Sequence, residues 1–108
     1  MDPLIVVVTG TSRGLGRSLA EHFLKNNCRV VGCSRSPSSI VNDLYDHTIL
    51  DLSNEKEVRS WIRSIRLKFH RIDVLICNAA MVQSALFLSL TPGDLMESFL
   101  KKNIAVLF

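Results

Sequence analysis

The sequence has few of the residues that build disulfide frameworks and metal sites. Its 108 residues include three cysteines and three histidines, and no two cysteines have the Cys-x-x-Cys spacing. An odd number of scattered cysteines favours buried free thiols over a reactive or metal-binding role. The histidines form no ligand pattern, so we expect no metal site. These residues are Cys28, Cys33, Cys77, His22, His47 and His70.

Long apolar runs and a basic N-terminal segment are also missing. No run approaches the ~18 apolar residues that cross a membrane, and Met1, Asp2 and Pro3 do not resemble the start of a signal peptide. Hydrophobic residues make up 47% of the chain and charged residues 21%, which is typical of a globular protein and not of a disordered one. We therefore expect a cytoplasmic protein without a membrane partner.

The net charge of +3 leaves a nucleic-acid interface as one interpretation of a basic helical segment. Glu55 and Glu57 share that segment, so its basic residues also fit the solvated face of an amphipathic helix, and we favour this second interpretation. We expect no nucleic-acid partner. The basic residues are Lys56, Arg59, Arg63 and Arg66.

Apolar runs alternate with amphipathic segments along the chain, which implies right-handed crossovers and a parallel sheet. The predicted fold class is α/β, the N-terminal half of a doubly wound parallel sheet with strand order 3-2-1-4 and strands five to seven absent. The predicted strands are residues 4–8, 29–34, 48–50 and 74–77, and the predicted helices are residues 14–26, a segment after Asn54, and a segment from Thr91 to the end.

For the first two helices, the sequence also predicts the buried face and, for the second, the residues that cap its start. Asn54 and Glu57 stand in capping-box positions at the start of the second helix. Apolar residues at helical spacing predict the buried face of each helix. They are Leu15, Leu19, Phe23 and Leu24 in the first helix, and Val58, Trp61, Ile62, Ile65 and Phe69 in the second.

A glycine-rich turn follows the first predicted strand and opens the first helix. Glycines let a backbone approach phosphates closely, and the free N–H groups and positive end of the helix dipole attract them. A tight structural turn is the alternative interpretation. The candidate nucleotide-binding residues are Gly10, Thr11, Ser12, Arg13, Gly14, Leu15 and Gly16.

An arginine stands at the end of the second predicted strand. Folds that bind NAD place an acid near this point to hold the ribose 2′-hydroxyl, whereas this chain has Arg35 there and Arg13 in the glycine turn. Two guanidinium groups suit a 2′-phosphate, which arginine can bind with two hydrogen bonds. The alternative is a pair of unrelated surface arginines.

Two further segments follow strands. Asp51 and Leu52 come after the third strand, where the carboxylate can accept a hydrogen bond from an adenine amino group or act as a plain helix cap. Asn78 and Ala79 come after the fourth strand. Small residues there allow a cofactor ribose to approach, and the Asn78 amide can tie neighbouring strands together, although an ordinary turn is also possible.

Together these residues resemble the short-chain dehydrogenase/reductase family in its NADP-preferring form. Thr9-Gly10-x-x-Arg13-Gly14-x-Gly16 looks like the cofactor motif of that family, and Cys77-Asn78-Ala79-Ala80 like its Asn-Asn-Ala-Gly stretch, with departures at Cys77 and Ala80. The resemblance implies NADP(H) as cofactor, hydride transfer to or from a carbonyl or alcohol substrate, and residues 1–108 as an incomplete Rossmann domain.

The last segment also resembles that family. Asn103-Ile104-Ala105-Val106-Leu107-Phe108 is similar to its Asn-x-x-Gly-x-Phe stretch, with Val106 in place of glycine. By resemblance, the preceding helix forms dimers, and Asn103 holds a water in a proton relay. From spacing alone, Asn103 shares the core side of a helix with Phe99, where a buried amide requires a hydrogen bond; a satisfied core asparagine is the alternative.

The resemblance implies a catalytic serine, a tyrosine followed four residues later by a lysine, and the asparagine at position 103; of these, only Asn103 is present. The chain has one tyrosine, Tyr45, with Ile49 four residues later, so it has no Tyr-x-x-x-Lys pair. We expect this chain alone to catalyse nothing, and we expect it to end in mid-helix at Phe108. Two hypotheses stay open: the N-terminal portion of an oxidoreductase, completed by a C-terminal half or assembled as a homo-oligomer, or a catalytically dead half-domain kept for nucleotide binding or as an interaction partner.

Overall fold

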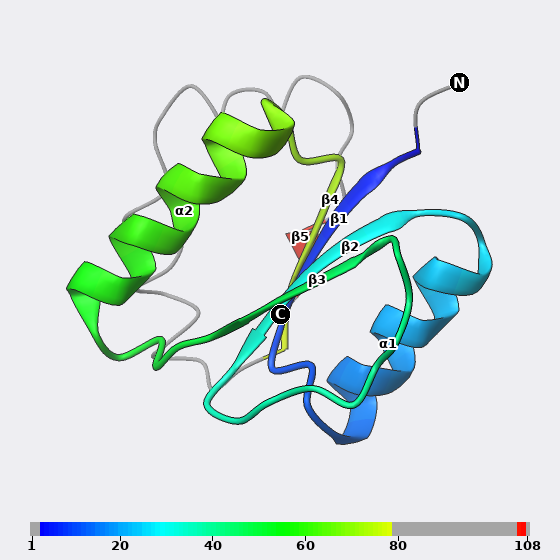
Figure 1. The fold of residues 1–108 in the computed structure, drawn as a ribbon, viewed down its shortest axis with the longest axis horizontal. Helices are drawn as coiled ribbons and strands as arrows, with labels where there is room; N and C mark the ends of the chain where they lie inside the picture. Colours follow the sequence, from blue (N-terminus) through cyan, green and yellow to red (C-terminus); the bar gives the residue numbers. More distant parts are fainter. Residues whose placement is uncertain (1–2, 79–105, 108) are drawn as a thin grey trace.

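A parallel β-sheet with a helix on each face forms the described part of the molecule (Figure 1). The structure is a computed structural model, and it describes residues 3–78 and the backbone of residues 106 and 107. The sheet order is β3-β2-β1-β4-β5, with every pair parallel, so the predicted order 3-2-1-4 is confirmed. The elements are β1 (Ile5–Thr9), α1 (Gly14–Lys25), β2 (Arg29–Ser34), β3 (Tyr45–Ile49), α2 (Glu55–Phe69), β4 (Val74–Cys77) and β5 (Val106–Leu107).

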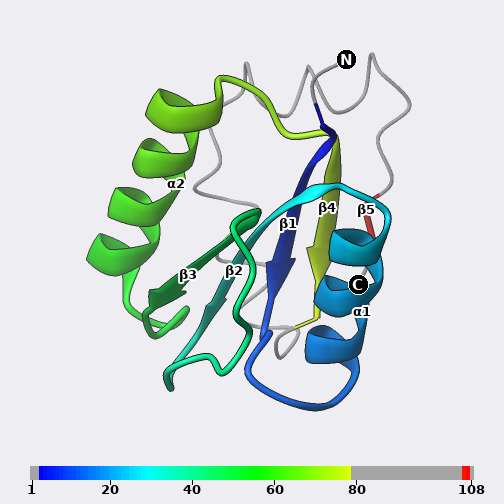
Figure 2. The ribbon, with the colours of Figure 1, turned by 45° about the vertical axis from the view of Figure 1, so that its right-hand side comes forward.

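Helices α1 and α2 cover opposite faces of the sheet, as Figure 2 shows. Every residue of β1 is buried, because alternate side chains of a strand point to opposite faces and both faces are covered. Val7 joins the cluster beneath α2, which includes Trp61, whereas Val6 joins the cluster beneath α1, which includes Ala20. The continuous apolar run in the sequence thus reflects a central strand packed on both sides.

The buried face of α2 agrees with the prediction, and that of α1 differs at its first residue. Val58, Trp61, Ile62 and Ile65 are buried, and Phe69 packs against them. In α1, however, Leu15 is 67% exposed, whereas Gly16 and Ala20 are buried. Leu15 lies in the first turn, before the helix reaches the sheet, so small residues make the close contact there.

The boundaries of β3 also differ from the prediction. The strand spans Tyr45–Ile49 instead of residues 48–50, and it pairs with β2 from Val30↔Tyr45 to Ser34↔Ile49. β3 is the edge strand of the sheet, and four of its five residues are partly exposed. A strand at the edge of a sheet can contain polar residues, so the apolar pattern used to predict strands did not detect the polar first residues of β3.

The prediction of a helix that continues to Phe108 is wrong at residues 106 and 107. Val106–Leu107 forms the short strand β5, which pairs with β4 through Leu75↔Val106 and Ile76↔Leu107. A fifth strand is therefore present, and β4 is not an exposed apolar edge. The pairing occupies backbone groups that β4 would otherwise leave open. Thr91, where this helix was predicted to start, lies outside the described residues.

An asparagine cap begins α2. The Asn54 side chain accepts a hydrogen bond from the Glu57 backbone N–H at 3.2 Å, which confirms half of the predicted capping box. In the other half, the Glu57 carboxylate accepts from the Asp51 N–H at 3.0 Å instead of from the Asn54 N–H. The side chain of Glu57 therefore ties the end of the β3–α2 loop to the helix.

Replacing Asn54 with alanine should lower the free energy of unfolding by about 1 kcal/mol, because the first-turn N–H would lose its acceptor. Urea denaturation followed by circular dichroism measures this change. Ser60→Ala, on the exposed middle of the same helix, is the matched control and should change stability by less than about 0.5 kcal/mol. Equal effects of the two substitutions would contradict the capping role.

Among residues 3–78, neither helix is long and apolar enough to cross a membrane, and no group of three or more histidine, cysteine or acidic side chains could hold a metal ion.

Candidate functional site

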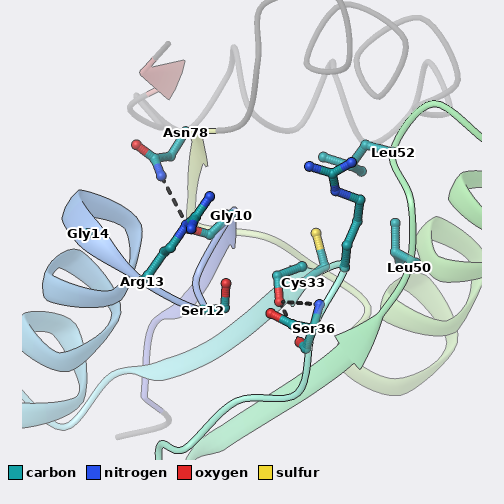
Figure 3. Close-up of a pocket in the computed structure, with 11 residues that line it drawn as sticks. Gly10, Ser12, Arg13, Gly14, Cys33, Ser36, Leu50, Leu52 and Asn78 are labelled. Atoms are coloured by element: carbon teal, nitrogen blue, oxygen red, sulfur yellow. Dashed lines mark hydrogen bonds between the residues drawn. The ribbon is translucent and has the colours of Figure 1, made fainter.

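A cavity of about 640 Å³ opens at the carboxyl ends of β1, β2 and β4. The chain adds β2 and β3 on one side of β1 and then β4 on its other side, so the direction in which strands are added reverses at β1. Ligands of open α/β sheets bind at such a switch point. In Figure 3, Arg13 and Asn78 lie on one side of the cavity, and Leu50 and Leu52 on the other. The cavity is lined by Gly10, Ser12, Arg13, Gly14, Cys33, Ser34, Arg35, Ser36, Leu50, Leu52 and Asn78.

The helix that points into this cavity has no side-chain cap. Arg13 stands at the N-cap of α1 in an extended conformation and caps no N–H with its side chain, and the first turn of α1 carries no acid. The same chain caps α2 with Asn54 and places two acids in its first turn. The N-terminus of α1 therefore keeps its free N–H groups and positive dipole end beside the cavity, an arrangement that favours an anion.

The glycine turn is closely packed on itself. Gly10 and Gly14 have positive φ angles of 76° and 61°, which glycine adopts without strain. A Cβ at Gly16 would overlap the Gly10 carbonyl oxygen. The Asn78 amide donates to that same oxygen at 3.2 Å, so the predicted tie between neighbouring strands is confirmed (Figure 3). The turn is thus held against both α1 and the end of β4.

Positive charge dominates the described lining of the cavity. Arg13 and Arg35 line it, and no carboxylate does. Within residues 3–78, neither guanidinium group makes a hydrogen bond or a salt bridge, although other arginines, such as Arg17 with Glu21, have acidic partners. Two arginines that make no salt bridge within residues 3–78 and that face one cavity suit an anion of high charge.

Asp51 lies next to the cavity but not on its lining. Its Oδ1 accepts hydrogen bonds from the Ser53 backbone N–H at 2.9 Å and from the Ser53 hydroxyl at 2.7 Å. These two bonds are the main causes that lower the pKa of Asp51, and the positive charge of Arg35 adds to them. The carboxylate therefore organises the β3–α2 loop, and it is not the helix cap of the alternative interpretation, because Asn54 caps α2. Its neighbours Leu50 and Leu52 are buried and form an apolar wall of the cavity.

Cys33 lies at the end of β2 and contributes a neutral wall. Burial raises the pKa of its thiol to about 12, so the sulfur carries no charge near neutral pH. Cys28, Cys33 and Cys77 are all buried and free, which confirms the prediction from their spacing.

The structure brings most, but not all, of the predicted site residues to this cavity. Thr11, Leu15, Gly16 and Asp51 do not line it, and Ala79 and Asn103 lie outside the described residues. The predicted residues that do line it are Gly10, Ser12, Arg13, Gly14, Arg35, Leu52 and Asn78. Sequence reasoning missed Cys33, Ser34, Ser36 and Leu50. Of these, only the two hydroxyls that flank Arg35 at a strand end offered a signal for anion binding.

Comparison with known proteins identifies the family. The sequence matches the family described as short chain dehydrogenase over residues 4–108. The chain belongs to this family. It is 33% identical over 111 residues to the 3-oxoacyl-(acyl-carrier-protein) reductase FabG of Buchnera aphidicola, an alignment that covers 96% of this chain and 45% of that protein. The chain thus spans about half the length of the curated relatives it matches, at 45% of each of the FabG proteins from Buchnera and Salmonella typhimurium.

Solved short chain dehydrogenases share the fold. One from Leptospira borgpetersenii with bound NAD+ has a TM-score of 0.77 at 17% identity and covers 98% of this chain and 51% of that one. A tyrosine-to-phenylalanine variant of ElxO with NADPH bound has a TM-score of 0.79 at 21% identity and covers 97% of this chain and 54% of that one. These two proteins, which share the fold, were thus solved with different nicotinamide cofactors.

Proposed function

We propose that this chain binds the adenosine 2′-phosphate half of NADP(H) for a short-chain oxidoreductase that acts on a carbonyl or alcohol substrate. When bound, this cofactor supplies or accepts a hydride. The observation that carries the proposal is the pair of arginines Arg13 and Arg35, which make no salt bridge within residues 3–78, in a cavity whose described lining contains no carboxylate.

The residues around the cavity match the chemical parts of that cofactor. The N-terminus of α1, with Gly14 as its first residue, would hold the pyrophosphate through backbone N–H groups. Arg13 and Arg35 would bind the 2′-phosphate with charge-assisted hydrogen bonds. The apolar wall of Leu50 and Leu52 would pack against the adenine ring.

The end of β2 supports NADP(H) over NAD(H). NAD-binding folds place a carboxylate there to accept hydrogen bonds from the ribose hydroxyls. In this chain the segment of residues 34–36 reads Ser-Arg-Ser, and its arginine lines the cavity. A carboxylate would repel a 2′-phosphate, whereas a guanidinium group attracts it.

We also propose that these 108 residues hold the cofactor without supplying the proton donor for the reaction. The single tyrosine of the chain, Tyr45, is bonded to Thr11 and His47 in the sheet. Hydride transfer to a carbonyl needs a group that gives a proton to the oxygen. In this proposal, that group and the substrate-binding residues belong to the rest of a complete enzyme.

Arg35→Asp should reverse the nucleotide preference of the full chain. We expect the dissociation constant for NADPH to rise about 10- to 100-fold, since a charge-assisted interaction is worth about 1.5–3 kcal/mol. Binding of NADH should stay constant or improve, because a carboxylate can accept from its ribose hydroxyls. Isothermal titration calorimetry with both nucleotides measures this.

Arg63→Asp, on the exposed face of α2 away from the cavity, is the charge-matched control and should leave both affinities unchanged. If Arg35→Asp weakens binding of NADPH and binding of NADH equally, the assignment of the 2′-phosphate site is wrong.

A further inference from the structure

A polar network of β3 side chains reaches residues Ser34 and Ser36, which line the cavity. The Thr11 hydroxyl lies 2.7 Å from the Tyr45 hydroxyl, which lies 2.7 Å from His47 Nδ1. His47 Nε2 lies 2.9 Å from the Ser36 carbonyl oxygen and 3.1 Å from the Ser34 hydroxyl. The network thus runs from the glycine turn, across β3, to the 34–36 segment that carries Arg35.

The Ser36 carbonyl, which can only accept, determines which groups of the network donate and which accept hydrogen bonds. The Ser36 carbonyl oxygen can only accept a hydrogen bond, so the His47 tautomer that fits these contacts has its proton on Nε2. Nδ1 is then an acceptor and receives the hydrogen of the Tyr45 hydroxyl, whose oxygen accepts from Thr11. Burial is the main cause that raises the pKa of Tyr45 above its ordinary value, so the hydroxyl keeps the proton that it donates.

A glycine in β2 makes room for these contacts. Glycine weakens a strand interior and often marks close approach of another group. Here a Cβ on Gly32 would overlap the Tyr45 hydroxyl and lie 2.6 Å from the Thr11 hydroxyl oxygen. Gly32 also pairs with His47 in the sheet register, so the Thr11, Tyr45 and His47 part of the network lies around this one position.

The network ends on the segment that presents the anion-binding side chains. Arg35 and Ser36 are exposed and line the cavity, so the protein holds this segment mainly through its backbone. The Ser36 carbonyl accepts from His47 and, at 2.7 Å, from the Ser34 hydroxyl, while the Leu50 N–H donates to the Ser34 carbonyl at 2.9 Å. The Gly10 and Thr11 N–H groups tie the glycine turn to the Cys33 carbonyl, beside the segment, and His47 connects the segment itself to the turn through Tyr45 and Thr11.

We infer that Tyr45 and His47 are positioning residues for nucleotide specificity: they fix the 34–36 segment so that Arg35 faces the 2′-phosphate of the bound nucleotide. This inference rests on the proposed function. Neither side chain lines the cavity, so both act through the Ser36 carbonyl and not by contact with the ligand. Their loss should weaken binding of the 2′-phosphate more than binding of the rest of the nucleotide.

The test compares two probes that fit the adenosine half of the site, adenosine 2′,5′-bisphosphate and adenosine 5′-monophosphate, in calorimetric titrations of the full chain. Tyr45→Phe removes one hydroxyl and keeps the ring over Gly32. We expect it to weaken binding of the bisphosphate about 3- to 10-fold, the loss that one hydrogen bond implies, and to change binding of the monophosphate less than about twofold.

His47 offers a conservative rescue. His47→Leu removes the donor to the Ser36 carbonyl and should produce the same selective loss as Tyr45→Phe. His47→Gln keeps an N–H donor of similar reach and should restore most of the preference for the bisphosphate. His22→Leu, on the exposed side of α1, is the matched control and should leave both affinities unchanged.

The outcomes separate this inference from the proposed function. If the unmodified chain binds both probes equally, the proposed 2′-phosphate site is wrong and the inference fails with it. If the unmodified chain prefers the bisphosphate, but Tyr45→Phe and His47→Leu keep that preference, only the inference is overturned. If a variant loses its fold in general, binding of both probes should weaken together and the midpoint of thermal unfolding should fall. This result would also overturn a specific positioning role.

Discussion

Gly16→Ala is expected to weaken nucleotide binding and to destabilise the fold. The added Cβ would overlap the Gly10 carbonyl oxygen, which is backbone and cannot rotate away. Either the turn or the start of α1 must shift, and the Asn78 bond to the same oxygen would be strained. We expect the free energy of unfolding to fall by about 3 kcal/mol, at the upper end of the range for overpacking. The affinity for NADPH should fall at least about tenfold, because the N–H groups of the turn would no longer converge.

Gly14→Ala provides a comparison within the same turn. Gly14 also has a positive φ, but a Cβ there would meet no atom within 4 Å. Its cost should be limited to the backbone strain of about 1–2 kcal/mol. Urea denaturation measures stability, and calorimetry measures NADPH binding. A loss of stability in Gly14→Ala as large as that in Gly16→Ala would show that backbone conformation, and not overlap, explains the requirement for glycine.

Trp61→Ala should have the largest effect on stability in the hydrophobic core. Trp61 is 3% exposed and belongs to the cluster that joins α2 to the sheet. Truncation of a buried tryptophan costs about 3–5 kcal/mol, through lost burial and the cavity left behind. Because the chain has one tryptophan, unfolding must be followed by circular dichroism instead of fluorescence.

The exposed face of the same helix supplies the control. Leu67 is 67% exposed, so Leu67→Ala should change stability by less than about 0.5 kcal/mol. If Trp61→Ala leaves no folded population, Trp61→Phe should keep the fold with a smaller loss, since much of the buried area remains. An equal effect of Trp61→Ala and Leu67→Ala would show that the α2 face is not packed as described.

Predictions from periodicity succeeded where both faces of an element are buried. The apolar run of β1 and the helical stripe of α2 are local patterns, and burial against the sheet produces both. Prediction was weaker for β3, whose edge position permits the polar residues Asp46 and His47. It was wrong at Val106 and Leu107, because pairing with β4 is a long-range contact that helical periodicity does not detect.

The candidate site shows the same division. Local spacing was enough to locate the glycine turn, the open N-terminus of α1 and the arginine at the end of β2, since each depends on residues adjacent in the chain. The bond between Thr11 and Tyr45 joins residues 34 positions apart. It exists because the side chain of Thr11, from the turn after β1, and that of Tyr45, from β3, both reach over Gly32 of β2, and no pattern along the chain encodes that meeting. The sequence therefore specified the groups that we propose bind the nucleotide, whereas folding specified the side chains that we infer hold those groups in place.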